Sequence, residues 1–81
     1  MVITISNLPP HVTEEHISDL LQGDSRIQRI TFNKEGNPDK VMALVQIDVS
    51  RLEAQFLANK LNHAYFEERH LDAYTPLFMG R

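Results

Sequence analysis

Three basic side chains, Arg29, Lys34 and Lys40, lie close together along the sequence and are the residues best suited to bind phosphate. Guanidinium and ammonium groups bind phosphate oxygens through charge-assisted hydrogen bonds. Asn33 and Gln46 lie in the same region, and their amide groups both donate and accept hydrogen bonds. The region therefore predicts a surface that holds a phosphate-bearing ligand and recognises its polar groups.

The four histidines do not form a catalytic or metal-binding pattern, because His11, His16, His63 and His70 are dispersed. His70 and Asp72 share a strand face at a spacing that could hold a metal, but the sequence implies no third ligand. It contains no phosphate-cradling glycine loop, nucleophile elbow or HExxH helix. We therefore expect a binding module and not an enzyme, with no cofactor and no metal.

The composition predicts one small domain. With 81 residues and 42% hydrophobic content, the chain is long enough for one core and too short for two. The absence of cysteine excludes disulfides and thiolate zinc sites and fits a reducing compartment. No apolar run approaches the roughly 20 residues that cross a bilayer, and no basic segment precedes an apolar stretch at the amino terminus. We expect a soluble, cytoplasmic protein.

The formal net charge of -3 gives the chain no general attraction for polyanions. The charges are unevenly distributed, so the local pattern decides what each surface attracts. Basic side chains gather around residues 26–40, whereas acidic ones gather in and after the first helical segment, at Glu14, Glu15, Asp19 and Asp24.

Periodicity predicts the elements that position these side chains. Ile3 and Ile5 alternate with polar residues, which indicates a half-buried strand over residues 2–6. Thr13 is a suitable helix cap, and we expect a helix from there to about Gln22, with Gly23 in a left-handed cap. A second strand is predicted over residues 27–33, a polar turn over 34–39 and a third strand over 41–48.

Ser50 is a good cap for a second helix, whose docking stripe consists of Ala54, Leu57, Ala58 and Leu61. Residues 65–68 could form a short extra strand or turn, and Leu71 with Ala73 marks a last strand. The order strand, helix, strand, strand, helix, strand is the split βαβ arrangement. We expect an α+β fold over residues 1–75, with two helices on one face of a four-stranded antiparallel sheet, and an apolar tail over 76–81.

Two strand segments resemble the ribonucleoprotein motifs of the RNA recognition motif (RRM) family. Residues 3–8 are similar to its hexamer motif, in which Asn7 and Leu8 match. Residues 40–47 are similar to its octamer motif, in which Lys40, Ala43 and Val45 match. The resemblance implies a ferredoxin-like βαββαβ fold that binds single-stranded RNA on its sheet.

Further matches follow in the expected order over nearly the whole chain. Leu61 and Asn62 resemble the start of the family's Leu-Asn-Gly segment, with His63 in place of the glycine. Residues 69–73 resemble its Arg-x-Leu-x-Val segment. These matches make the family fold the leading expectation.

The outward aromatic positions of the two motifs hold Thr4, Met42 and Leu44 in this chain. Stacking of a base on an aromatic side chain contributes about 1–3 kcal/mol per base. We therefore expect weak or non-standard RNA binding, with phosphate bound by Arg29 and Lys40, base edges by Asn33 and Gln46, and stacking by Tyr74. The candidate RNA-binding residues are Thr4, Ser6, Arg29, Asn33, Lys34, Lys40, Met42, Leu44, Gln46 and Tyr74.

Two protein-interaction alternatives remain open. The apolar residues of the sheet could be covered by a second copy or by the tail residues Leu77, Phe78 and Met79, because apolar patches often mark partner contacts. Leu52 and Phe56 project on the side of the second helix opposite its docking stripe, where they could bind a protein or form a homodimer.

The acidic first helix lies beside residues 69–71 in this arrangement. Some splicing-factor relatives bind protein ligands through an acidic first helix and an Arg-x-Phe motif, but Leu71 stands where that motif has phenylalanine. A solvated helix face is the preferred interpretation of these acids.

Overall fold

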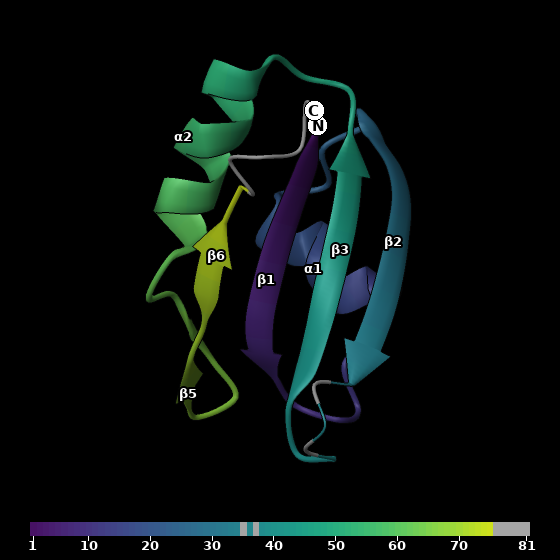
Figure 1. The fold of residues 1–81 in the computed structure, drawn as a ribbon, viewed down its shortest axis with the longest axis vertical. Helices are drawn as coiled ribbons and strands as arrows, with labels where there is room; N and C mark the ends of the chain where they lie inside the picture. The colour runs from purple at the N-terminus through teal and green to yellow at the C-terminus, as the bar shows by residue number, and fades with distance from the viewer. Residues whose placement is uncertain (35, 37, 76–81) are drawn as a thin grey trace.

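The computed structural model describes residues 1–34, 36 and 38–75 and shows a sheet with two helices against one face (Figure 1). Its first half contains β1 (Val2–Leu8), α1 (Glu14–Leu20), β2 (Ile27–Lys34) and β3 (Val41–Ile47). The second half contains α2 (Arg51–Leu61), the short strands β4 (Tyr65–Phe66) and β5 (Arg69–His70), and β6 (Asp72–Tyr74). The predicted tail, with Leu77 and Phe78, lies outside the described residues.

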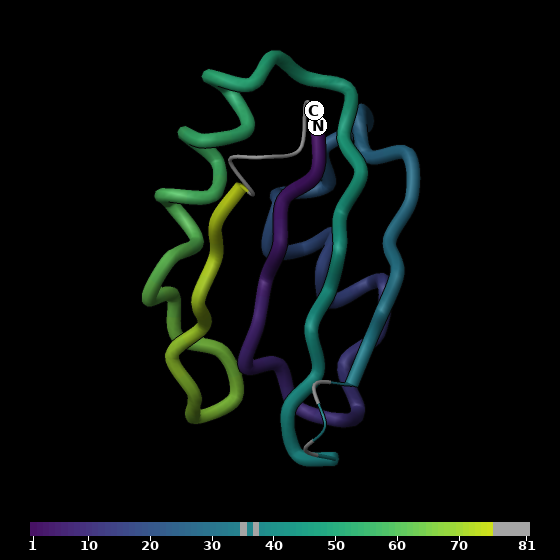
Figure 2. The backbone as a smooth tube through the Cα atoms, viewed as in Figure 1, coloured from purple at the N-terminus to yellow at the C-terminus, as the bar shows by residue number. Residues whose placement is uncertain are grey.

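The four-stranded sheet is antiparallel and has the order β2-β3-β1-β6 (Figure 2). This order confirms the predicted βαββαβ arrangement, in which the two motif-bearing strands β1 and β3 are central neighbours. β1 pairs with β3 on one side and with β6 on the other, for example through Thr4, which lies opposite both Leu44 and Tyr74. The central strands therefore bring the two motifs together.

The core lies between the sheet and the helices. Ile3 and Ile5 of β1 are fully buried, as are Ala43, Val45 and Ile47 of β3. The docking stripe of α2 is confirmed, because Ala54, Ala58 and Leu61 are buried and Leu57 packs against the same cluster. Alternation along the strands and helical spacing along α2 thus select one common face for burial.

Both predicted helix caps are present. The Thr13 hydroxyl accepts a hydrogen bond from the His16 backbone N–H at 3.3 Å, and the Ser50 hydroxyl accepts one from the Glu53 N–H at 3.2 Å. α1 ends at Leu20, earlier than the expected Gln22, because Gln22 has a φ of 60° and has left the helical region. β2 extends to Lys34, and β3 ends at Ile47 instead of Asp48.

The segment predicted as an extra strand or turn is a small hairpin formed by β4 and β5. Its two turn residues, Glu67 and Glu68, both have positive φ, at 51° and 68°. Such a pair matches the twist of the strands in a two-residue hairpin. Among the described residues no helix is long and apolar enough to cross a membrane.

Candidate nucleic-acid interface

The strand register places most of the predicted residues on the face of the sheet that the helices leave uncovered. Residues that pair across neighbouring strands point to the same side of a sheet. One row runs Thr31, Leu44, Thr4 and Tyr74 across all four strands. Arg29 lies opposite Gln46 in a second row, and a third row pairs Asn33 with Met42 and Ser6 with Asp72. We call this surface the open face.

The open face combines exposed polar groups with half-buried apolar ones. Arg29, Asn33 and Gln46 are exposed, and Tyr74 retains 48% of its accessible surface. Met42 and Leu44, at the motif's aromatic positions, are half-buried. The face can therefore offer cationic, amide and phenol groups around an apolar centre.

Thr4 does not fit its predicted role as a contact residue, since it retains only 2% of its surface. Its small side chain lies on a central strand, directly between Leu44 of β3 and Tyr74 of β6. Thr4 therefore offers little surface to a ligand on the open face.

The two predicted lysines lie in different places. Lys34 pairs with Val41, whose side chain is buried in the core, so Lys34 points to the helix side of the sheet. β2 continues one residue further than expected and places Lys34 on the helix side instead of on the open face, so its contact with RNA stays a prediction. Lys40 is exposed just before β3, at the rim of the open face.

Arg26, from the same basic region, is held elsewhere by two carboxylates. Its guanidinium donates to Asp24 at 2.8 Å and to Glu53 of α2 at 2.7 Å. The hydrogen bonds from Arg26 lower the pKa of Asp24 from 3.8 to about 2. This network joins the start of β2 to α2, so that Arg29 and Lys40 are the basic side chains beside the open face in the described part of the chain.

Val2 is a residue of the open face that was not among the predicted contacts. It pairs with Gln46 and is half-buried. Strict alternation from Thr4 and Ser6 would have placed it there. Asp72 also lies on this face and is exposed, so its carboxylate would repel a phosphate group placed near Ser6.

Asn7 has a structural role that the motif alone does not explain. It has a φ of 67° at the register shift between Ile5 and Leu8, and its side-chain amide donates to the His70 carbonyl at 2.9 Å. Asparagine is among the residues that best tolerate this backbone region. Asn7 therefore ties the end of β1 to the β4–β5 hairpin.

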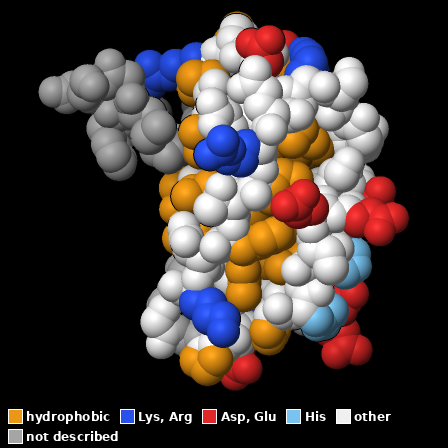
Figure 3. Space-filling view, turned by 90° about the vertical axis from the view of Figure 1, so that its right-hand side faces the viewer, with side chains coloured by type: hydrophobic (Ala, Val, Ile, Leu, Met, Phe, Trp, Pro, Cys, Tyr) orange, Lys and Arg blue, Asp and Glu red, His pale blue; other side chains and the backbone are white. Residues whose placement is uncertain are grey.

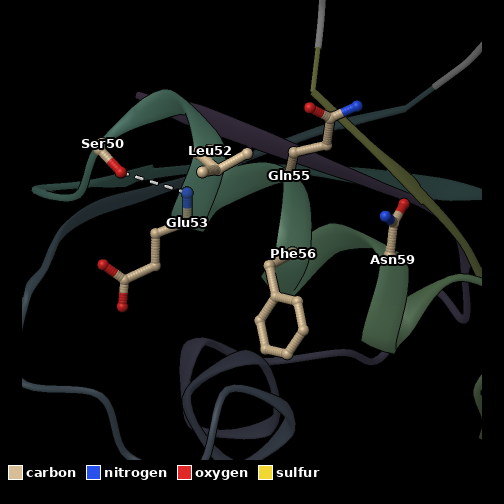
Figure 4. A pocket seen from close by; sticks show the side chains of 6 residues that line it. All are labelled: Ser50, Leu52, Glu53, Gln55, Phe56 and Asn59. Atoms are coloured by element: carbon tan, nitrogen blue, oxygen red, sulfur yellow. Dashed lines mark hydrogen bonds between the residues drawn. The ribbon is translucent and has the colours of Figure 1, made fainter.

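The outer side of α2 carries the other predicted interface. Leu52 and Phe56 retain 79% and 62% of their surface and line an open pocket with Gln55 and Asn59 (Figure 4). The ring of Phe56 extends away from the helix, and the Lys60 ammonium lies 5.7 Å from its centre. The predicted direction of both side chains is confirmed; what they contact stays a prediction.

In the described part of the structure, the side chains of residues 69–71 are held away from the acidic side chains of α1. Leu71 is fully buried, and the Arg69 guanidinium donates to the backbone carbonyls of Leu8 and Asp39. His70 contacts the His63 carbonyl at 3.2 Å. Among the described residues no three acidic, histidine or cysteine side chains are arranged to bind a metal.

Comparison with solved structures supports the fold. No protein-family profile and no curated protein matches the sequence. Among solved structures, the third RRM of Pes4 is 20% identical and superposes with a TM-score of 0.76, covering 93% of this chain and 89% of that one. The Rna15 RRM with bound RNA (GU) is 20% identical, with a TM-score of 0.68 and coverages of 91% and 81%.

A third similar structure holds the N-terminal three RNA-binding domains of the yeast splicing factor Prp24. It is 24% identical, with a TM-score of 0.70, over 98% of this chain and 32% of that one. At these identities the likeness is one of fold. The chain has the fold of these RRM domains.

Proposed function

We propose that this RRM-like domain binds single-stranded RNA weakly on its open face. The observation that carries the proposal is the register, which gathers Arg29, Gln46, Asn33 and Tyr74 around Met42 and Leu44 on the face of the sheet that the two helices leave uncovered. The arrangement supports binding rather than catalysis. The RNA recorded with the similar Rna15 domain supports the same class of ligand.

Each group has a distinct task in this proposal. Arg29 and Lys40 attract phosphate from two positions beside the face, and the amides of Asn33 and Gln46 bond to base edges. Tyr74 is the exposed aromatic of the face among the residues that the structure describes, and it offers a stacking surface, flanked by the apolar side chain of Leu44 across Thr4. Because the described face offers one aromatic side chain for stacking, the affinity for RNA should depend strongly on the charges of Arg29 and Lys40.

The outer side of α2 supports a second candidate function, a protein contact through Leu52 and Phe56. Large apolar side chains this exposed, side by side on one helix, are typical of contact surfaces. The partner would be a protein or a second copy of the chain. Concentration-dependent amide shifts at these residues in the RNA-free protein would reveal self-association.

The RNA proposal predicts the behaviour of Arg29→Ala/Lys40→Ala. The double variant should bind a short random-sequence RNA more weakly, and the slope of log affinity against log salt should fall by about 0.7 for each phosphate contact removed. Fluorescence anisotropy over a salt series measures both. Amide shifts should map to the open face.

The matched control is Arg51→Ala/Lys60→Ala, which removes the same charge from α2, away from the open face. It should keep most of the salt slope of the unchanged chain. If no RNA binding is detected at low salt, the proposal is wrong. If both double variants weaken RNA binding equally, the open face is not the binding site.

A further inference from the structure

β2 is a long strand at an open edge of the sheet. It contains eight residues, Ile27–Lys34, and pairs with β3 on one side only. Within the described residues no strand pairs with its other side. Such an edge exposes a row of backbone N–H and C=O groups that can pair with another extended chain.

The helix-facing side of this edge is incompletely covered. Ile27, Ile30 and Phe32 pack against the core but are only half-buried, whereas the corresponding residues of β1 and β3 are fully buried. α1 has seven residues and leaves a hollow of about 410 Å³ between itself and β2. Figure 3 shows the resulting band of hydrophobic side chains running down this side of the molecule.

Acidic side chains of α1 line the same hollow. Glu14 and Glu15 are exposed, and neither forms an ion pair with a basic side chain of the described residues. Asp24 also lines it but is held by Arg26. We call the hollow with the adjacent edge of β2 the edge trough.

We propose that the edge trough binds an extended, basic segment of a partner protein, which adds a strand to β2. Lysine and arginine suit it because their aliphatic stems can cover Ile27 and Ile30 while their charged ends reach Glu14 and Glu15. Lys34 is the last residue of β2 and would repel a basic side chain of the partner. The basic residues of the partner therefore lie at the other end of the strand, beside Glu14 and Glu15 of α1. This inference does not depend on RNA binding.

Two other occupants fit less well. RNA is disfavoured because its phosphates would face Glu14 and Glu15. A second copy paired edge to edge would add its own β2, whose helix side carries Ile27, Ile30 and Phe32 and a single cation, Lys34. The charge of the trough therefore selects a basic partner chain.

The test uses two synthetic peptides of alternating pattern, acetyl-Thr-Lys-Thr-Val-Thr-Lys-Thr-amide and the counterpart with Glu for Lys. The basic peptide should shift the amide signals of β2 and α1 in NMR titrations and leave those of β6 in place. A basic peptide N-methylated on alternate residues, which cannot donate along the edge, should bind at least several-fold more weakly.

The double variant Glu14→Gln/Glu15→Gln should bind the basic peptide about fivefold more weakly, which is the effect expected from the loss of two exposed charge pairs. The control Asp48→Asn/Glu68→Gln removes the same amount of charge elsewhere and should bind the basic peptide as tightly as the unchanged chain does. An equal response to both peptides, shifts confined to the open face, or no shift at millimolar peptide would each overturn the proposal. Displacement of the peptide by RNA would likewise contradict it.

Discussion

Two residues in the segments that resemble the family, Asn7 and His63, have a backbone in the left-handed region. Asn7 has the residue type that the family motif expects, whereas His63 does not. His63 occupies the position of the family's glycine and has a φ of 71°, in the left-handed region. Asn7 has a similar φ, but its side chain gains a hydrogen bond to the His70 carbonyl. Both positions have a left-handed backbone in this chain, and the Asn7 side chain offsets part of the conformational cost at its own position through this hydrogen bond.

Replacing His63 by glycine should stabilise the domain. A non-glycine residue costs about 1–2 kcal/mol in the left-handed region, and part of this gain is lost to the greater freedom of glycine in the unfolded chain. We expect a net increase of about 0.5–1 kcal/mol in the free energy of unfolding, measured by urea denaturation. His63→Ala is the control, because alanine keeps the strained φ. Equal stability of the glycine and alanine variants would contradict this explanation.

At the scale of elements, alternation and capping residues were sufficient to predict every strand of the main sheet and both helices. The β4–β5 hairpin was only partly predictable, because its turn residues Glu67 and Glu68 are not the usual Asn and Gly. Tertiary contacts hold it instead. The Arg69 guanidinium bonds to the Leu8 carbonyl, and the rings of His16 and Phe66 lie 5.5 Å apart. Such long-range contacts have no local sequence signal.

The ion pair between Asp24 and Arg26, just before β2, should make stability depend on acid. The pKa of Asp24 is about 2 in the folded chain against an ordinary 3.8, so its contribution is present above 3.8 and is lost as pH falls toward 2. Asp24→Asn keeps an oxygen for the Arg26 N–H but removes the charge. The variant should therefore lose less stability than the unchanged chain over this pH window, measured by urea midpoints.

Asp48→Asn provides the comparison, since Asp48 is an exposed carboxylate on the segment before α2. It should leave the acid sensitivity in this window close to that of the unchanged chain. If Asp24→Asn and the unchanged chain lose stability in parallel between these pH values, the ion-pair network does not act as described.

At the scale of the whole molecule, the fold and the ligand surface depend on different faces of the same strands. Ile3, Ile5 and Val45 specify the core, and their pattern was visible in the sequence. The exposure of the open face was less predictable, because the 2% exposure of Thr4 has no local signal in a strand that alternates regularly. The side of the sheet on which Lys34 lies likewise depends on where β2 ends. Register, which a single sequence does not reveal, decides these details.

Restoring an aromatic at the centre of the open face should strengthen RNA binding. Leu44 lies in the row between Thr31 and Thr4, so the ring of Leu44→Phe would rest over two small side chains and present its face to a base. A gain of about 1 kcal/mol, at the low end for base stacking, corresponds to about fivefold tighter binding of a short single-stranded RNA. Leu52→Phe adds the same ring on the outer side of α2 and should change the affinity little. If both variants bind alike, the missing aromatics do not limit RNA binding by this face.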